Sequence, residues 1–179
     1  PPTPPTPPKQ DSDDPPLDGR ALLAAAKAGD LASVVAILDA ASDADVERLV
    51  RFRGQGTPDA VIGNTAAHWA AARGHTGVLR TILERADIIH ARNNGDSTVL
   101  HSAALNGHVE CIHELRRRGA DPEARDEFGD SAISIATRAG RTETLDALTT
   151  PLAALPAAAT HAAVTADAPA PAPAADTRD

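Results

Sequence analysis

A block of about a dozen residues recurs along the chain at a fixed spacing of 33 residues. The clearest repeated positions are Gly74, Gly107 and Gly140, with Thr65, Thr98 and Ser131 before them. Self-similarity at a fixed period of roughly 20–50 residues is the signature of a stacked repeat array, in which each unit buries its apolar face against its neighbours. Arrays of this kind present extended surfaces that recognise other molecules. The repeat therefore predicts a binding function rather than chemistry.

Each unit is predicted to contain two helices joined by a tight turn and followed by a hairpin. In the second unit, Thr65 precedes an apolar run as a natural N-cap. Gly74 ends the first helix, because glycine tolerates positive φ. The second helices carry apolar stripes at helical spacing. These stripes are Val78, Leu79, Ile82 and Leu83, then Cys111, Ile112 and Leu115, then Leu145 and Leu148.

The predicted organisation is one all-α domain between two disordered tails. The expected segments are a Pro-rich tail at 1–16, the array at 17–153 with units near 18–58, 59–92, 93–125 and 126–153, and an Ala/Pro-rich tail at 154–179. The first unit is 12 residues longer than the period, and the extra length falls at residues 42–56. Apolar residues at helical spacing there predict a short helix followed by a flexible loop.

Charge and composition limit the class of partner. The 179 residues carry a formal net charge of −8, which argues against nucleic acid and anionic membranes because both favour a basic face. Residues 19–155 hold 15 basic and 18 acidic side chains, so most of the excess lies in the tails. Aromatic residues make up only 2%, which predicts a core of closely packed small side chains. No apolar stretch approaches the roughly 20 residues that cross a bilayer.

The single cysteine, Cys111, excludes an internal disulfide framework and favours a reducing compartment. A cytoplasmic location is therefore expected. The chain begins with proline, so a removed signal segment would instead indicate a periplasmic or secreted protein. Fifteen arginines against two lysines, with abundant alanine, fit a GC-rich bacterial or protist genome.

The repeated residues resemble the ankyrin repeat over about three quarters of the chain. The family pattern is Asp-x-x-Gly-x-Thr-Pro-Leu-His-x-Ala-Ala-x-x-Gly-His. It is matched at Gly63, Thr65, His68, Ala70, Ala71, Gly74 and His75, again at Thr98, Leu100, His101, Ala103, Ala104, Gly107 and His108, and in part at Asp126, Gly129, Ser131 and Ile133. Ala66, Val99 and Ala132 stand where the family has proline, and Ser134 replaces the third histidine.

The resemblance implies an ankyrin-repeat solenoid of stacked helix-turn-helix units with connecting β-hairpin loops. It also implies that a partner protein binds the hairpin tips and the concave face of the first helices. The positions that match the variable, solvent-facing sites and the unit junctions are Val61, Ile62, Asn64, Ala72, Arg73, Arg92, Asn94, Ser97, Leu105, Asn106, Arg125, Glu127, Phe128, Asp130 and Arg138.

Three apolar residues at these tips, Val61, Ile62 and Phe128, are typical of interface anchors, particularly with arginines nearby. Arg92 and Arg125 are predicted to offer planar hydrogen bonds to partner carboxylates. The main hypothesis is a monomeric adaptor or stoichiometric inhibitor. The alternative is a secreted or host-directed bacterial effector that uses the same surface. An enzyme is a third class, which would need a cleft.

We predict no cofactor, metal or catalytic site. His108, Cys111 and His113 fall within six residues, but Cys111 belongs to the apolar stripe and His113 lies about 200° round the helix from it. The period accounts for four of the seven histidines, namely His68, His75, His101 and His108. His68 and His101 are expected to hydrogen-bond neighbouring hairpins. No phosphate loop or nucleophile elbow is present in the sequence.

Three further features have two interpretations each. Trp69 is expected between first helices, with a partner contact as the alternative. The basic run 116–118 complements a helix dipole, with phosphate or phosphopeptide capture as the alternative. Pro4-x-x-Pro7-x-Lys9 fits an SH3 ligand, although proline-rich tails match this pattern by chance. Thr3 and Thr6 precede prolines, which permits proline-directed phosphorylation.

Overall fold

A computed structural model describes residues 18–54 and 61–154. The described elements are α1 (Gly19–Ala28), α2 (Leu31–Ala40), α3 (Asp43–Val50), α4 (Ala66–Ala72), α5 (Thr76–Arg85), α6 (Val99–Asn106), α7 (Val109–Arg117), α8 (Ala132–Arg138), α9 (Thr142–Thr149) and the 3₁₀ turn η2 (Leu152–Ala154). Isolated antiparallel bridges join Arg92 to Thr98 and Arg125 to Ser131, closing two hairpins. The predicted all-α repeat stack with hairpin connections is confirmed.

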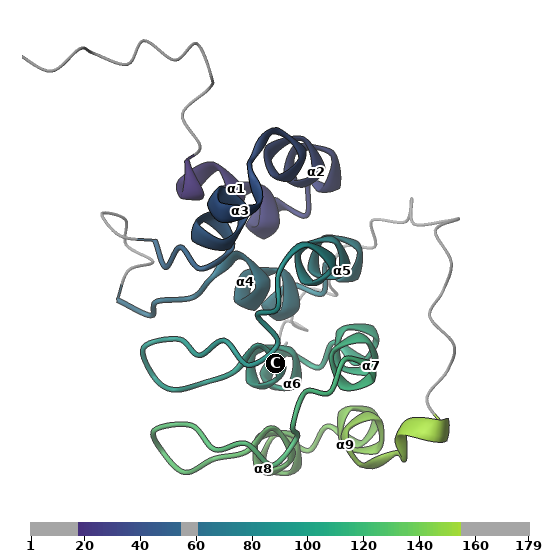
Figure 1. The fold of residues 1–179 in the computed structure, drawn as a ribbon. Helices are drawn as coiled ribbons and strands as arrows, with labels where there is room; N and C mark the ends of the chain where they lie inside the picture. The colour runs from purple at the N-terminus through teal and green to yellow at the C-terminus, as the bar shows by residue number, and fades with distance from the viewer. Residues whose placement is uncertain (1–17, 55–60, 155–179) are drawn as a thin grey trace, which may run out of the picture.

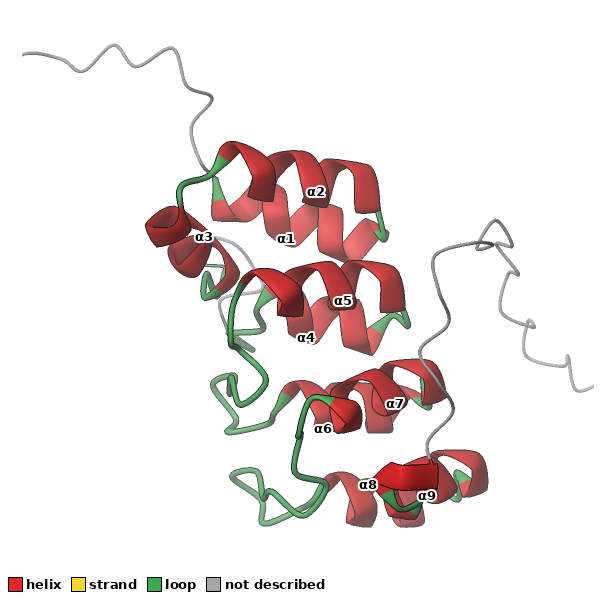
Figure 2. Cartoon of the chain, turned by 45° about the vertical axis from the view of Figure 1, so that its right-hand side comes forward, coloured by secondary structure: helices red, strands yellow, loops and turns green. Residues whose placement is uncertain are grey.

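The helices form two layers. Helices α1, α4, α6 and α8 stack as the first layer, and α2, α5, α7 and α9 stack beside them as the second, on the right in Figure 1. The hairpins that open the third and fourth units project from the first-layer side, away from the second helices (Figures 1 and 2). Hairpins and first helices therefore share one side of the array.

The two layers differ in the size of their buried side chains. The first helices meet through alanines, and Ala26, Ala67, Ala70, Ala71, Ala103, Ala104 and Ala136 are all fully buried. The second helices supply larger groups, and the predicted stripe Val78, Leu79, Ile82 and Leu83 is buried in α5. Small side chains let helices approach closely, and dense packing is what gives a protein core its stability. A chain with few aromatics therefore still builds a continuous core.

The repeated hydroxyl residues begin the first helices, as predicted. Thr65 and Thr98 are the N-caps of α4 and α6, and Ser131 is the N-cap of α8. The backbone N–H of Thr65 donates to Nδ1 of His68 at 3.4 Å, and that of Thr98 donates to Nδ1 of His101 at 3.1 Å. Each bond satisfies a donor at the start of a helix, where the backbone has no helical partner.

The extra length of the first unit contains α3, which confirms the predicted short helix. Its apolar side holds Val46, Leu49 and Val50, which are buried in the common core. Phe52 then lies over Gly19, where a Cβ would sit 2.4 Å from the ring. The start of α1 is therefore covered by the segment that follows α3.

Several sequence predictions lie outside the described residues. These are the two disordered tails, apart from Ala154 of η2, the end of the loop after α3, the SH3-type motif and the two threonines that precede prolines. The unit boundaries stay a prediction. Among the described residues, no helix has the length and apolar character needed to cross a membrane.

Substituting Leu115→Ala should destabilise the protein far more than Leu105→Ala. Leu115 is 0% exposed and Leu105 is 58% exposed. Truncating a buried leucine costs about 2–5 kcal/mol, whereas exposed changes usually stay within about 0.5 kcal/mol. Urea melts of both variants measure the two losses, and equal losses would contradict the assigned facing of α6 and α7.

Candidate functional site

Histidines of one unit hold the hairpin of the next. Nε2 of His68 lies 3.0 Å from the carbonyl oxygen of Ser97, and Nε2 of His101 lies 3.1 Å from that of Asp130. The predicted role of these two histidines is confirmed. Ser134, which occupies the same position in the fourth unit, instead closes its own turn through bonds with Ser131. The fourth unit has no further described unit to contact, which accounts for the shorter side chain.

The hydrogen bonds of His68 define its tautomer. Because Nδ1 accepts from the backbone N–H of Thr65, the proton lies on Nε2, which donates to the carbonyl of Ser97. Burial lowers the pKa of His68 to about 4, although the Ser97 carbonyl acts in the opposite direction. A second proton would have to sit on Nδ1, facing a donor. The neutral imidazole is therefore required for the bond that Nδ1 accepts at the start of α4, whereas the Nε2 bond to the hairpin does not depend on the second proton.

A second set of histidines packs on the glycines that end the first helices. Gly74 has a φ of +77°, and a Cβ there would lie 2.6 Å from the ring of His108. Nε2 of His108 lies 3.1 Å from the carbonyl oxygen of Ala72, near the end of α4. His75 lies over Gly29 in the same way. The repeated Gly-His pair is thus a contact between units, a role that the sequence analysis did not predict.

Backbone hydrogen bonds join successive hairpin tips. The N–H of Asn94 donates to the carbonyl of Ile62 at 3.0 Å, and the N–H of Glu127 donates to the carbonyl of Gly95 at 3.1 Å. The Asn94 side chain also donates to the carbonyl of Val61 at 3.2 Å. The tips therefore form a connected edge rather than independent loops, and a preorganised surface loses less entropy when it binds.

Three residues predicted to face a partner instead make hydrogen bonds within or between the hairpins. Asn64 is 7% exposed and accepts from the Asn93 amide at 2.9 Å, so the prediction that it faces solvent is wrong. Nη1 of Arg92 donates to the carbonyls of Asp96 and Arg125, at 2.7 and 2.8 Å. These planar hydrogen bonds, expected toward a partner, here join two hairpins.

Arg125 closes its own hairpin in a similar way. Its Nη1 donates to the carbonyl of Gly129 at 2.6 Å. Periodicity did not reveal these bonds, because Arg92 and Arg125 look like surface residues in a sequence. Their acceptors are backbone carbonyls, whose position only the turn geometry defines. Both arginines therefore shape the edge on which the tip side chains stand.

The apolar residues predicted at the tips are exposed. Phe128 and Val61 are each 82% exposed, and Ile62 and Leu105 are also among the exposed large apolar residues of the array. Glycine occupies the equivalent tip of the third unit, at position 95, between Ile62 and Phe128. Exposed apolar groups on a rigid edge mark contact surfaces more often than scattered single ones do.

The first helices add polar and charged groups to the same side. Arg73, Asn106 and Arg138 are exposed at the ends of α4, α6 and α8, and Ala72 is half-buried. Arg138 pairs with Asp130 at 2.7 Å. The predicted residues Ser97 and Asn94 belong to the third hairpin, and Glu127 to the fourth. The structure thus brings together the predicted surface residues, except the buried Asn64.

Trp69 is half-buried, so it is neither fully packed between the first helices nor fully exposed to a partner. The Lys27 ammonium lies 4.1 Å from the centroid of its ring, and the guanidinium carbon of Arg73 lies 6.0 Å away. Both distances fall within the range of cation–π attraction. Lys27 was absent from the sequence prediction. Counting back from Ala72 across the 12-residue insertion would have placed it at the equivalent position.

The opposite side of the array is polar and structural. Arg116 is buried and donates to the carbonyl of Ala147 at 3.0 Å in the neighbouring α9. Arg117 and Arg118 pair with the buried Glu114 at 2.9 and 2.8 Å. The basic run was predicted to complement the dipole of its own helix. Arg116 does place a cation at a helix C-terminus, but the helix is α9 of the next unit.

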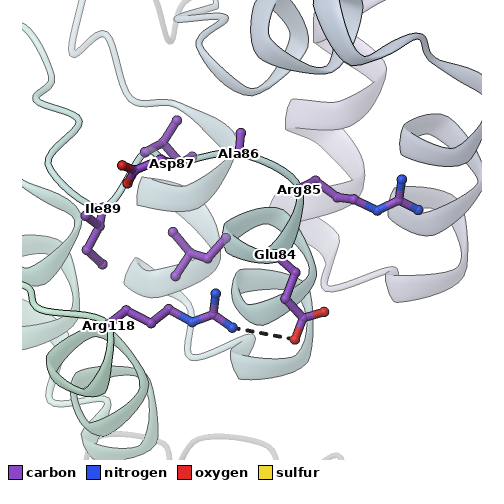
Figure 3. Close-up of a pocket in the computed structure, with 8 residues that line it drawn as sticks. Glu84, Arg85, Ala86, Asp87, Ile89 and Arg118 are labelled. Atoms are coloured by element: carbon purple, nitrogen blue, oxygen red, sulfur yellow. Dashed lines mark ion pairs between the residues drawn. The ribbon is translucent and has the colours of Figure 1, made fainter.

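A shallow pocket opens beside this network, between the end of α5 and Arg118 (Figure 3). Glu84 and Arg118 point toward one another across its edge, with their charged atoms 3.5 Å apart. No group of His, Cys, Asp and Glu suited to a metal occurs among the described residues. Cys111 is buried against Thr76, and burial raises the pKa of its thiol to about 11, so it is a poor nucleophile.

Comparison with known proteins identifies the family. A family model described as ankyrin repeats, in three copies, matches residues 21–126. The chain belongs to the ankyrin-repeat family. It is 39% identical over 57 residues to human ankyrin repeat domain-containing protein 29, covering 31% of this chain and 19% of that protein. It is 34% identical over 83 residues to the E3 ubiquitin-protein ligase KEG of Arabidopsis thaliana, covering 46% of this chain and 5% of that protein.

Among solved structures, this ankyrin-repeat chain is similar to one in the crystal structure of the yeast ribosomal protein Rps3 in complex with its chaperone Yar1. The TM-score is 0.62 with 30% sequence identity, covering 72% of this chain and 88% of that chain. The match to the curated relatives is much shorter, since the chain spans less than a quarter of the length of each of those two proteins.

Stability should fall as the pH is lowered from about 6.5 to 4. The folded pKa of His68 is about 4 against an ordinary 6.5, so in this window the unfolded chain binds a proton that the folded chain excludes. The stabilisation is complete above pH 6.5, and its full loss at pH 4 corresponds to about 3 kcal/mol.

Urea melts at several pH values measure this loss. His113 also has a pKa lowered by burial and contributes with the same sign, so a His68→Gln variant isolates the share of His68. The variant should be less stable at pH 7 and should depend less on pH. A variant with an unchanged pH dependence would show that His68 does not need to be neutral.

Proposed function

We propose that this protein is a protein-binding module, an adaptor or stoichiometric inhibitor that acts as a monomer. The observation that carries the proposal is the connected edge of hairpin tips, which holds exposed Val61, Ile62 and Phe128 on a hydrogen-bonded backbone. A few anchored apolar side chains supply most of the binding energy in many protein interfaces. The first helices, with Arg73, Leu105, Asn106 and Arg138, extend the same surface.

The comparison with solved structures supports this proposal. The similar chain comes from a complex between a ribosomal protein and its chaperone, so an array of this size and shape has been seen in an assembly built around one protein partner. This similarity favours recognition of a protein partner.

The alternative, a secreted or host-directed bacterial effector, would use the same face. The arginine-rich and alanine-rich composition favours it, and the lone free Cys111 favours the cytoplasmic adaptor. The two differ in the compartment of the partner rather than in the mode of binding. Identifying the captured partner therefore distinguishes them.

Phe128→Ala should weaken partner binding by at least about tenfold, or 1.4 kcal/mol, while changing the free energy of unfolding by less than about 1 kcal/mol. The ring is 82% exposed, so its removal leaves no cavity. Affinity capture with the full chain supplies the partner, and calorimetry and urea melts on the same variant measure binding and stability.

A matched pair of valines gives the control for this experiment. Val61→Ala removes a tip side chain, whereas Val35→Ala removes an exposed valine from α2, on the opposite layer. Only Val61→Ala should weaken binding. If Phe128→Ala melts early and binds normally, the ring packs on the array and the proposed anchor is wrong.

A further inference from the structure

The four first helices contain no acidic residue, although the chain as a whole is acidic. Together with their last-turn residues, α1, α4, α6 and α8 carry Arg20, Lys27, Arg73 and Arg138. All 18 acidic side chains of the described residues lie on other segments. The chain has a net charge of −8, yet the helices α1, α4, α6 and α8 themselves carry only positive side-chain charge, with Asp18 and Asp130 just before the first residues of α1 and α8.

The last turns of these helices form a regular row. Lys27, Ala72, Leu105 and Arg138 occupy equivalent positions, and we call them the first-helix row. The equivalence is structural as well as numerical, because His75 contacts the carbonyl of Lys27 as His108 contacts that of Ala72. Because α1, α4, α6 and α8 stack in this order, the side chains of the row along the array are a cation, a small residue, an apolar residue and a second cation (Figure 1).

Trp69 adds a second apolar group beside this row. It lies one turn before Ala72 on α4, and its half-buried ring is flanked by Lys27 and Arg73. In the next unit, the exposed Leu105 takes the place of Ala72. Around the first three positions of the row, Lys27 and Arg73 thus lie beside the aromatic Trp69 and the aliphatic Leu105.

We propose that the first-helix row binds an acidic segment of the partner protein, with its carboxylates facing Lys27 and Arg73 and an apolar side chain between Trp69 and Leu105. This inference rests on the proposed function and specifies the chemistry of the partner. Arg138 marks the far end of the site, where it already pairs with Asp130. The planar guanidinium fork of Arg73 matches the geometry of a carboxylate.

The row also defines a length for the partner segment. Packed helices lie about 8–10 Å apart, so three steps from Lys27 to Arg138 span about 24–30 Å. A helix covers that distance with about 16–20 residues. A helical partner segment would need this length, with acidic residues toward its ends and an apolar residue in its middle.

Charge on the neighbouring hairpins argues against nucleic acid at this face. Asp96, Asp126, Glu127 and Asp130 lie on the hairpins that border the first helices. A long polyanion following the row would meet these carboxylates and would gain little from counterion release. A short acidic segment can present its charge to the cations alone.

The test is a selection of 18-residue, Trp-free random peptides by display on the full chain. Enriched peptides should carry net negative charge and an apolar residue in the middle. Trp69 is the only tryptophan, so its emission reports binding directly. Arg73→Glu should raise the Kd of an enriched peptide at least tenfold, and 0.5 M NaCl should weaken binding as well.

Arg48→Glu on α3 is the charge-matched control, because Arg48 is 83% exposed and lies outside the first-helix layer. It should change the Kd less than twofold. Circular-dichroism melts check that the variants fold, and Leu105→Asp replaces Arg73→Glu if the latter melts early. If Arg48→Glu changed the Kd as much as Arg73→Glu, or as Leu105→Asp in its place, the proposal would be overturned.

Other outcomes separate this inference from the proposed function. Enrichment of neutral or basic peptides whose binding needs Phe128 would overturn the acidic assignment and leave the protein-binding function intact. The assignment to a protein segment would be overturned if a 20-nucleotide single-stranded DNA or phosphatidylserine vesicles bound more tightly than the enriched peptide. Enrichment of no peptide, together with unchanged partner binding by Phe128→Ala, would overturn both proposals.

Discussion

Hydrogen bonds from the histidines of one unit to the backbone of an adjacent unit hold this array together. His68 and His101 each cap their own helix through Nδ1 and hold the following hairpin through Nε2. His75 and His108 instead reach back to the end of the preceding first helix. The second and third units are thus joined at both the hairpin and the turn between helices, the first and second at the turn, and the third and fourth at the hairpin. Stability in a repeat array depends on such nearest-neighbour contacts, since no residue reaches a distant unit.

The proposed binding surface follows from this arrangement. The hairpin that carries the exposed Phe128 is held at its base by His101, and backbone hydrogen bonds between tips connect it to the two preceding hairpins. Among the described residues, no acidic side chain lies within a first helix, although Asp18 caps the start of α1, so the first helices offer a basic and apolar face. A predominantly acidic protein thereby acquires one face that favours an acidic partner, and electrostatic complementarity of this kind sets specificity and association rate.

The periodicity of the sequence predicted the repeated elements of this structure, but it did not predict contacts that depend on turn geometry or that cross the insertion. The 33-residue repeat predicted the helix pairs, the caps at Thr65 and Thr98, and the role of His68, because each of these depends on a local pattern that recurs. It failed for Asn64 and for the directed bonds of Arg92, whose partners are an amide and carbonyls brought close only by the turn geometry. The Lys27–Trp69 contact was missed because the insertion interrupts the period between the two residues.

The central claim is that the hairpin tips form a preformed, rigid edge rather than mobile loops. Hydrogen–deuterium exchange of the backbone amides of Asn94 and Glu127 tests it most directly, since both donate to the preceding hairpin. We predict exchange at least about a hundredfold slower than in an unstructured peptide, a protection of about 2.8 kcal/mol. Protection should drop at Asn94 in a His68→Ala variant, with Glu127 retaining more of it. Exchange of both amides at the rate of an unstructured peptide in the wild-type protein would contradict the account.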